Sequence, residues 1–210
     1  LPYPTVLTDG VLEDMADYFL KQLTECKHCG AFQGAVEGFE HLCVRMWLIG
    51  GEKRGAKPEK WLEQSMKAIE GEIGSLCLTR RSAGLPHLVT TLLVTEPYWS
   101  KCQLLLSTVS TLLDMEGKSM ETTVHSYNVM KAIVNCARLS DKIQPALETA
   151  LLTSIMGCSS SEWPIRNASS QLLSSLISRI FGVPRDGHKD LKPHSQNTMS
   201  ASEFFARLFP

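Results

Sequence analysis

Apolar residues recur every three or four positions along most of the chain, which is the spacing that places them on one face of an α-helix. The pattern predicts eight helices, at residues 11–28, 32–49, 58–72, 85–95, 99–115, 121–138, 142–157 and 163–182. The β-branched run at 88–94 resembles a strand by propensity, but its helical neighbours favour a buried helix. Strand signals are nearly absent elsewhere, so we expect an all-α protein.

Taken in pairs, these helices begin near residues 11, 58, 99 and 142, a period of roughly 40–47 residues that is typical of HEAT and armadillo repeats. We therefore expect a HEAT/armadillo-type helical-repeat solenoid. Because the chain begins at Leu1 and ends at Pro210 within an amphipathic segment, we expect a fragment of a larger repeat protein. The polar stretch at 183–200 predicts a mobile loop before another helix near Ser202.

The composition fits a packed globular chain. Of the 210 residues, 43% are hydrophobic and 20% are charged, with a net charge of −1, so bulk electrostatics do not predict nucleic-acid binding. Any RNA contact must come from a local patch, and the densest basic cluster is Lys53, Arg54, Lys57 and Lys60. No apolar run reaches the roughly 18 residues of a membrane span, so no membrane span is expected.

Seven cysteines are an odd number, which fits reduced thiols in a cytosolic or nuclear protein better than a disulfide scaffold, and we expect a cytoplasmic protein. Cys43, Cys102 and Cys136 fall within helical apolar patterns and are expected to be small buried hydrophobes. Cys26 and Cys29 have the spacing of half a zinc knuckle, but no second pair exists. We expect no metal and no cofactor.

The segment from Thr79 to Pro86, reading TRRSAGLP, is the most informative stretch of the chain. Arginine suits planar, bidentate contact with a carboxylate or phosphate, and two arginines beside a Gly-Pro break suggest a fixed recognition corner. The alternative is that Arg80 and Arg81 cap a helix end or bridge neighbouring helices. Adjacent residues point in different directions, so we expect one arginine to pair with an interior carboxylate and the other to face a groove.

Two further pairs of polar residues are candidates. His125 and Asn128 share a helix face with Ala132, where a contact within the helix or to a neighbouring loop is the simpler interpretation. Arg166 and Asn167 follow Trp163 and Pro164 at a predicted helix start, a position that favours anions. Alternatively, Arg166 pairs with an acidic side chain of the preceding repeat and Asn167 holds a loop. No catalytic triad, P-loop or Gly-rich nucleotide turn is recognisable, so we do not expect an enzyme.

Four stretches resemble the THADA-like family in both sequence and order. They are RRSAGLP at 80–86, HSYNVMKAI at 125–133, WPIRNASSQLLSSLISRIFG at 163–182 and SEFFARLFP at 202–210. Residues 1–75 match only as helical repeats, so we divide the chain into repeats at 1–75 and a family-signature helical-repeat domain at 76–210. Leu173 departs conservatively from a position where the family commonly has Phe.

The resemblance implies a non-catalytic adaptor for an FtsJ-type methyltransferase, which modifies a ribose 2′-hydroxyl at position 32 in the tRNA anticodon loop. The enzyme subunit would hold the methyl donor, and the tRNA anticodon stem-loop would be a second partner. Carried over by motif, the first partner- or RNA-binding candidates are Arg80, Arg81, Ser82, Gly84 and Pro86, and the second are His125, Asn128, Arg166 and Asn167. The alternative function is a helical scaffold that binds only proteins.

Overall fold

A computed structural model of the protein describes residues 8–25, 29–50, 57–71 and 84–181, together with positions 202, 205 and 206. The described part is all-α and contains no strand, as the sequence predicts. Its helices are α1 (Asp9–Glu25), α2 (Cys29–Gly50), α3 (Lys57–Ile69), α4 (Leu85–Val94), α5 (Gln103–Asp114), α6 (Met120–Asn135), α7 (Leu147–Gly157) and α8 (Trp163–Phe181). The expected mobile loop at 183–200 lies outside the described residues.

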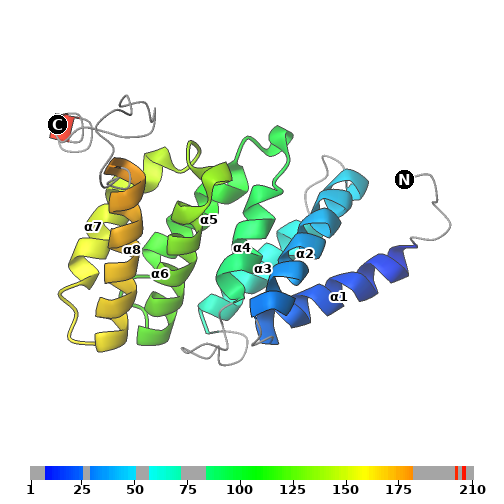
Figure 1. The fold of residues 1–210 in the computed structure, drawn as a ribbon, viewed down its shortest axis with the longest axis horizontal. Helices are drawn as coiled ribbons and strands as arrows, with labels where there is room; N and C mark the ends of the chain where they lie inside the picture. Colours follow the sequence, from blue (N-terminus) through cyan, green and yellow to red (C-terminus); the bar gives the residue numbers. More distant parts are fainter. Residues whose placement is uncertain are drawn as a thin grey trace.

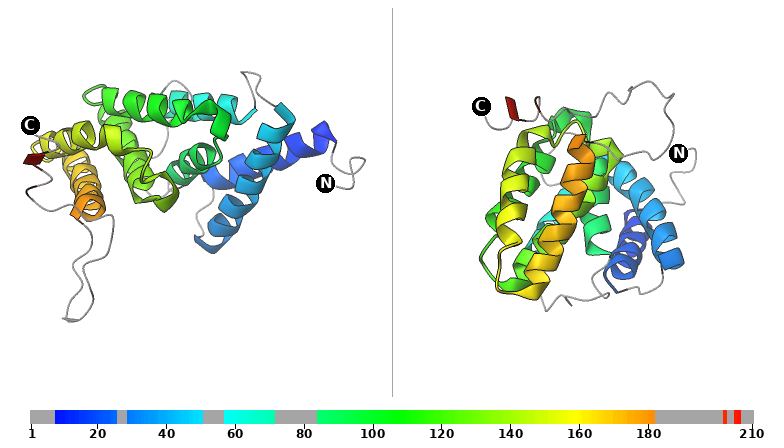
Figure 2. Two further views of the ribbon diagram at one scale, coloured as in Figure 1. Left: turned by 90° about the horizontal axis from the view of Figure 1, so that it is seen from above. Right: turned by 60° about the vertical axis from the view of Figure 1, so that its left-hand side comes forward.

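The helices stack in antiparallel pairs along one axis, with α1 and α8 at opposite ends (Figure 1). The pairs begin at residues 9, 57, 103 and 147, a repeat of about 44–48 residues that agrees with the predicted period. The even-numbered helices pack in succession, α2 on α4, α4 on α6 and α6 on α8. Seen from above, they form one layer, and α3, α5 and α7 form a second (Figure 2). This arrangement is a helical-repeat solenoid.

A continuous apolar core lies between the two layers. Phe39 of α2, Leu92 of α4, Leu112 of α5, Ile133 of α6 and Leu172 of α8 are almost completely inaccessible to solvent. The strand-like run at 88–94 is helical, because Leu88, Val89, Leu92 and Leu93 at helical spacing bury one face of α4. Since α2 and α3 both pack against α4, the core is continuous across the proposed division at residues 75 and 76.

Two helices begin later than the sequence pattern indicates. Residues Tyr98–Ser100 form a 3₁₀ turn, and Lys101 and Cys102 adopt left-handed backbone conformations, so α5 begins at Gln103. A second 3₁₀ turn at Gln144–Ala146 contains a proline and delays α7 to Leu147. Periodicity alone does not separate a 3₁₀ turn from the first turn of an α-helix, which explains both differences.

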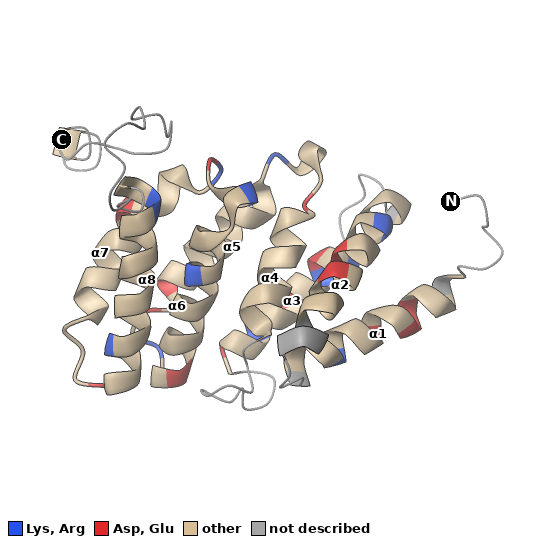
Figure 3. Cartoon of the chain, viewed as in Figure 1, with Lys and Arg blue, Asp and Glu red and all other residues tan. Residues whose placement is uncertain are grey.

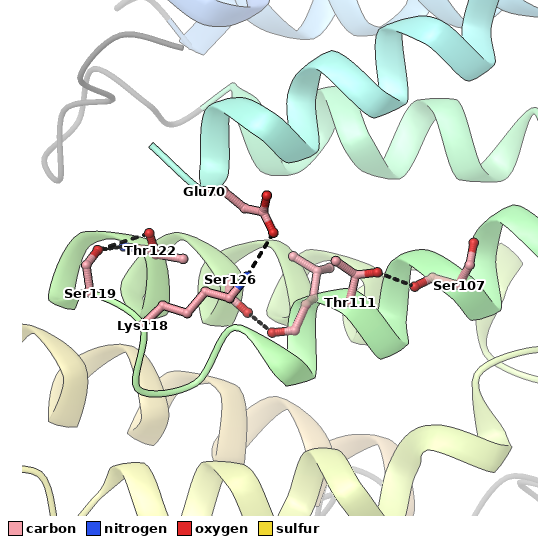
Figure 4. A network of polar contacts seen from close by, with 8 residues as sticks. Glu70, Ser107, Thr111, Lys118, Ser119, Thr122 and Ser126 are labelled. Atoms are coloured by element: carbon pink, nitrogen blue, oxygen red, sulfur yellow. Dashed lines mark hydrogen bonds and ion pairs between the residues drawn. The ribbon is translucent and has the colours of Figure 1, made fainter. Parts of the chain in front are cut away.

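Polar side chains cap helix ends and link one helix pair to the next. The Ser119 hydroxyl caps α6 by accepting from the Thr122 amide at 3.1 Å, and the neighbouring Lys118 forms an ion pair of 3.0 Å with Glu70 at the end of α3 (Figure 4). The Arg179 guanidinium of α8 donates twice to the Val134 carbonyl, at 2.9 and 2.6 Å, near the end of α6. These contacts fix the helices of successive pairs relative to one another.

Glu96 supplies the cap that α5 lacks locally, because Cys102 at its N-cap makes no side-chain bond. The Glu96 carboxylate accepts from the amides of Leu104 and Leu105, at 2.9 and 3.1 Å. We expect Glu96→Gln to destabilise the protein by about 1 kcal/mol, because an amide nitrogen cannot accept the second bond. Thermal unfolding is the measurement, with Glu37→Gln on the exposed surface of α2 as the control. Equal melting temperatures for the two variants would contradict this capping role.

Candidate functional site: a groove across α4, α6 and α8

A hollow of the described surface crosses three even-numbered helices and has a volume of about 1240 Å³. We call it the α4–α6–α8 groove. Its apolar lining includes Leu85 and Pro86 of α4, Val124 and Val129 of α6, and Trp163 and Pro164 of α8. Its polar lining consists of His87, Thr90, His125, Asn128, Lys131, Asn135, Asn167 and Gln171.

Helical spacing brings these polar residues onto one surface. On α8, Trp163, Asn167 and Gln171 follow one another at intervals of four residues, so they lie one above the next on the same face. On α6, Asn128 and Asn135 are seven residues apart, which again corresponds to one face. Because α6 and α8 pack directly against each other, the two faces join into a single polar strip.

The groove carries little charge. Among the described residues, its lining contains one lysine and no aspartate, glutamate or arginine, and charged positions are sparse along α4, α6 and α8 (Figure 3). The Lys131 ammonium donates to Gln171 Oε1 at 2.7 Å and so links α6 to α8. Partial burial lowers the pKa of the His87 imidazole, which is therefore neutral at pH 7. Hydrogen bonding rather than net charge dominates this surface.

Four of the residues selected from the sequence line this groove: Pro86, His125, Asn128 and Asn167. His125 is buried within α6, Asn128 is half-buried, and Asn167 is exposed. Gly84 is buried at the N-cap of α4, directly before the lining residues Leu85 and Pro86. Arg80, Arg81 and Ser82, and with them the expected unequal roles of the two arginines, lie outside the described residues.

Arg166 occupies a different place from these four. Its guanidinium Nη1 donates to the carbonyls of Ser160 and Ser161, at 2.8 and 2.7 Å, and thereby ties the α7–α8 loop to the first turn of α8. Glu162 stands at the N-cap of α8, because its carbonyl accepts from the Arg166 amide at 3.1 Å. Arg166 is therefore engaged with backbone carbonyls, a contact that the sequence interpretation did not consider.

The sequence interpretation did not select Trp163, Lys131, Gln171 or His87 as members of a site. Trp163 was noted only as part of a helix start, yet its side chain is 66% exposed at the groove. One signal was available, because tryptophan, asparagine and glutamine at intervals of four residues form a surface stripe on any helix. Lys131 and His87 carried no such signal, since their place depends on how α4, α6 and α8 align.

The remaining candidates show no site within the described part of the chain. Cys43 is buried, and desolvation raises the pKa of its thiol to about 12, whereas Cys102 and Cys136 are half-buried against the core. Lys57 of the basic cluster pairs with Glu13, while Lys53 and Arg54 lie outside the described residues. Cys26 also lies outside the described residues, and the side chain of its CxxC partner Cys29 is not described. The described helices hold no cluster of metal-ligating side chains, and none of them is long and apolar enough to cross a membrane.

Comparison with known proteins gives matches that extend over almost the entire chain. The family described as "THADA/TRM732, DUF2428" matches residues 2–164, and "Trm732, C-terminal TPR repeats" matches residues 166–210. A chicken (Gallus gallus) protein named "tRNA (32-2'-O)-methyltransferase regulator THADA" is 34% identical over 99% of this chain. The fission yeast (Schizosaccharomyces pombe) regulator trm732 is 30% identical over 97% of it. The chain spans only 11% and 14%, respectively, of these two relatives, and no solved structure gives a significant match.

Proposed function

The chain belongs to the THADA/TRM732 family, and we propose that it acts within a non-catalytic regulator of a methyltransferase that modifies the ribose 2′-hydroxyl at position 32 of tRNA. The observation that carries this proposal is that relatives from chicken, fruit fly and fission yeast are all named as regulators of such an enzyme. Their identity to this chain is 30–34% over 96–99% of its length. The similarity therefore includes the helices that form the groove.

We further propose that the enzyme is of the FtsJ type and that the anticodon stem-loop of tRNA is a second partner. A stack of helices offers extended surfaces on which two macromolecules can be held in a fixed relation. Holding the enzyme and its substrate together lowers the entropic cost of the reaction without any chemistry from the regulator. In this scheme the enzyme binds the methyl donor and the regulator supplies contacts. The free cysteines of the described helices suit a cytoplasmic location.

The α4–α6–α8 groove and the motif before it form the proposed recognition surface. The motif ends where the groove begins, because Pro86 belongs both to the motif and to the groove lining. Arg80 and Arg81 precede Gly84 by four and three residues in the sequence. Arginine at such a place suits a carboxylate of the enzyme or a phosphate of the tRNA, and it serves either through paired hydrogen bonds.

A reconstituted reaction tests the proposed function. The full-length protein, an FtsJ-type methyltransferase and an unmodified tRNA are mixed, and 2′-O-methylation at position 32 is measured together with co-purification of the enzyme. We expect the enzyme to co-purify with the protein and to methylate position 32 at least tenfold more slowly without it. An enzyme that works equally well alone, or that does not associate with the protein, would contradict the proposal.

A further inference from the structure

The chemistry of the α4–α6–α8 groove narrows the kind of molecule that occupies it. Asparagine side chains offer a carbonyl acceptor and an NH₂ donor, the same two functions that a peptide group presents. Asn128 of α6 is half-buried and Asn167 of α8 is exposed, and they line the groove from adjacent helices. Exposed amides of this kind can pair with both the N–H and the C=O of a backbone that lies across them.

We propose that the groove binds an extended polypeptide segment of the methyltransferase, with Asn128 and Asn167 hydrogen-bonded to its backbone. The inference rests on the proposed function for the identity of the partner. It goes further in assigning this surface to the enzyme rather than to the tRNA.

The spacing of the helices suits an extended peptide. Axes of helices in direct contact lie about 8–10 Å apart, and a β-strand advances about 3.3 Å per residue. Three residues of an extended segment therefore cover the step from α6 to α8, so Asn128 and Asn167 would meet peptide groups about three residues apart. An α-helical ligand would offer no backbone groups to these amides, because its own hydrogen bonds already use them.

Trp163 provides the apolar contact beside this hydrogen-bonding strip. Its indole is 66% exposed and lies one turn before Asn167 on the same face of α8. An exposed tryptophan flanked by amides is a typical anchor for an aliphatic side chain or for the stem of a lysine or arginine. Alternate side chains of an extended segment point to the same surface, so one of them would pack on Trp163.

The low charge of the groove argues for a polypeptide over RNA. A nucleic-acid strand that crossed three helices would bring several phosphates, each of which is normally neutralised by lysine or arginine. In the part of the chain that the structure describes, the lining offers a single lysine, and its ammonium is already bonded to Gln171. A peptide backbone has no net charge and needs hydrogen-bonding partners, which this lining supplies.

Binding measurements on the full-length protein test the proposal. The Asn128→Ala, Asn167→Ala double variant is compared with Gln64→Ala, Gln103→Ala, which removes two exposed amides from α3 and α5 outside the groove. Affinities for the methyltransferase and for tRNA are measured separately, each at two salt concentrations. We expect the groove variant to bind the enzyme at least roughly tenfold more weakly than wild type, because several hydrogen bonds are lost. Its affinity for tRNA should stay within twofold of wild type. Both affinities of the control variant should also stay within twofold of wild type.

Several outcomes would overturn the inference. Unchanged enzyme affinity in the groove variant would do so, as would a loss confined to tRNA with a steep salt dependence, which would identify RNA as the occupant. Failure of the wild-type protein to bind the enzyme at all would refute the proposed function itself, so the two failures are distinguishable.

A cross-linking measurement keeps the test independent of the stability of the alanine variant. A benzophenone amino acid replaces Asn135, an exposed residue of the same groove, and the complex with enzyme and tRNA is irradiated. We expect an adduct with the methyltransferase that maps to one contiguous peptide. An adduct with tRNA, or no adduct in a complex that is shown to be assembled, would contradict the proposal.

Discussion

The Gly157→Val variant is expected to lower the free energy of unfolding by about 3 kcal/mol, near the upper end of the usual cost of overpacking a core. Gly157 is buried at the end of α7, where α7 packs against α8. A Cβ atom at this position would lie 2.2 Å from Ser169 Oγ, 2.9 Å from Tyr127 Oη and 3.0 Å from Tyr127 Cε2. Both neighbours are at most 1% exposed, so neither has open space into which it can move.

The hydrogen bonds around Gly157 add to this cost. Ser169 donates to the Ile165 carbonyl at 2.7 Å, and the Tyr127 hydroxyl lies 3.2 Å from a Glu116 carboxylate oxygen. Burial, together with the nearby Glu116 charge, raises the pKa of Tyr127, so the phenol stays protonated and acts as a donor. A valine side chain would displace these groups from their partners and leave buried polar atoms unsatisfied.

Thermal unfolding measures the effect, and a fall in melting temperature of roughly 6–12 °C is expected for a chain of this size. Gly34→Ala is the matched control, because Gly34 lies within α2 with no atom within 4 Å of the added Cβ. That change should be neutral or stabilising by up to about 1 kcal/mol, since alanine favours helices more than glycine does. Ser169→Ala removes the closest clash, so we expect it to restore part of the stability lost in Gly157→Val. If Gly157→Val had the melting temperature of the wild type, the α7–α8 contact would be more adaptable than its geometry indicates.

The close packing at Gly157 illustrates what a sequence of this kind reveals and what it leaves open. Periodicity predicted all eight described helices, because apolar residues at helical spacing must face one core. It did not reveal that Gly157 is the point where α7 and α8 approach, because that contact depends on the relative register of two helices. Glycine at a helix end is equally typical of a simple terminus.

The candidate site shows the same limit. Asn128 and Asn167 were selected because they belong to motif-bearing helices, and they do line one groove. Trp163 and Gln171 share one face of α8 with Asn167, a spacing that the sequence shows, whereas Lys131 joins them only because α6 and α8 lie side by side in a particular register. The interpretation of Arg166 considered side-chain partners and missed backbone carbonyls, although loops between helices commonly leave such carbonyls to be satisfied. Spacing within one helix is visible in a sequence, whereas alignment between helices is not.

Combined replacement of Arg80 and Arg81 by alanine is expected to reduce support of tRNA methylation by roughly a hundredfold or more. Each guanidinium can make charge-assisted hydrogen bonds worth about 1.5–3 kcal/mol to a carboxylate or phosphate. The two arginines stand shortly before Gly84 and Pro86, where α4 enters the groove wall. Methylation at position 32 is measured in the reconstituted reaction, with Arg138→Ala as the control. Arg138 forms only a surface ion pair with Glu40, so its loss should leave methylation unchanged.

The competing account holds that this arginine pair stabilises the fold, and thermal unfolding separates it from a role in binding. A buried arginine taken from its carboxylate costs about 3–5 kcal/mol, a large part of a typical stability of 5–15 kcal/mol. Lost methylation with an unchanged melting temperature would therefore support a contact to the enzyme or the tRNA. The Arg80→Lys, Arg81→Lys variant should also lose most activity, because lysine keeps the charge but not the planar pair of donors. If the alanine variant loses its cooperative thermal unfolding transition as well as its support of methylation, the two arginines act by stabilising the fold. Their assignment to the recognition surface is then wrong.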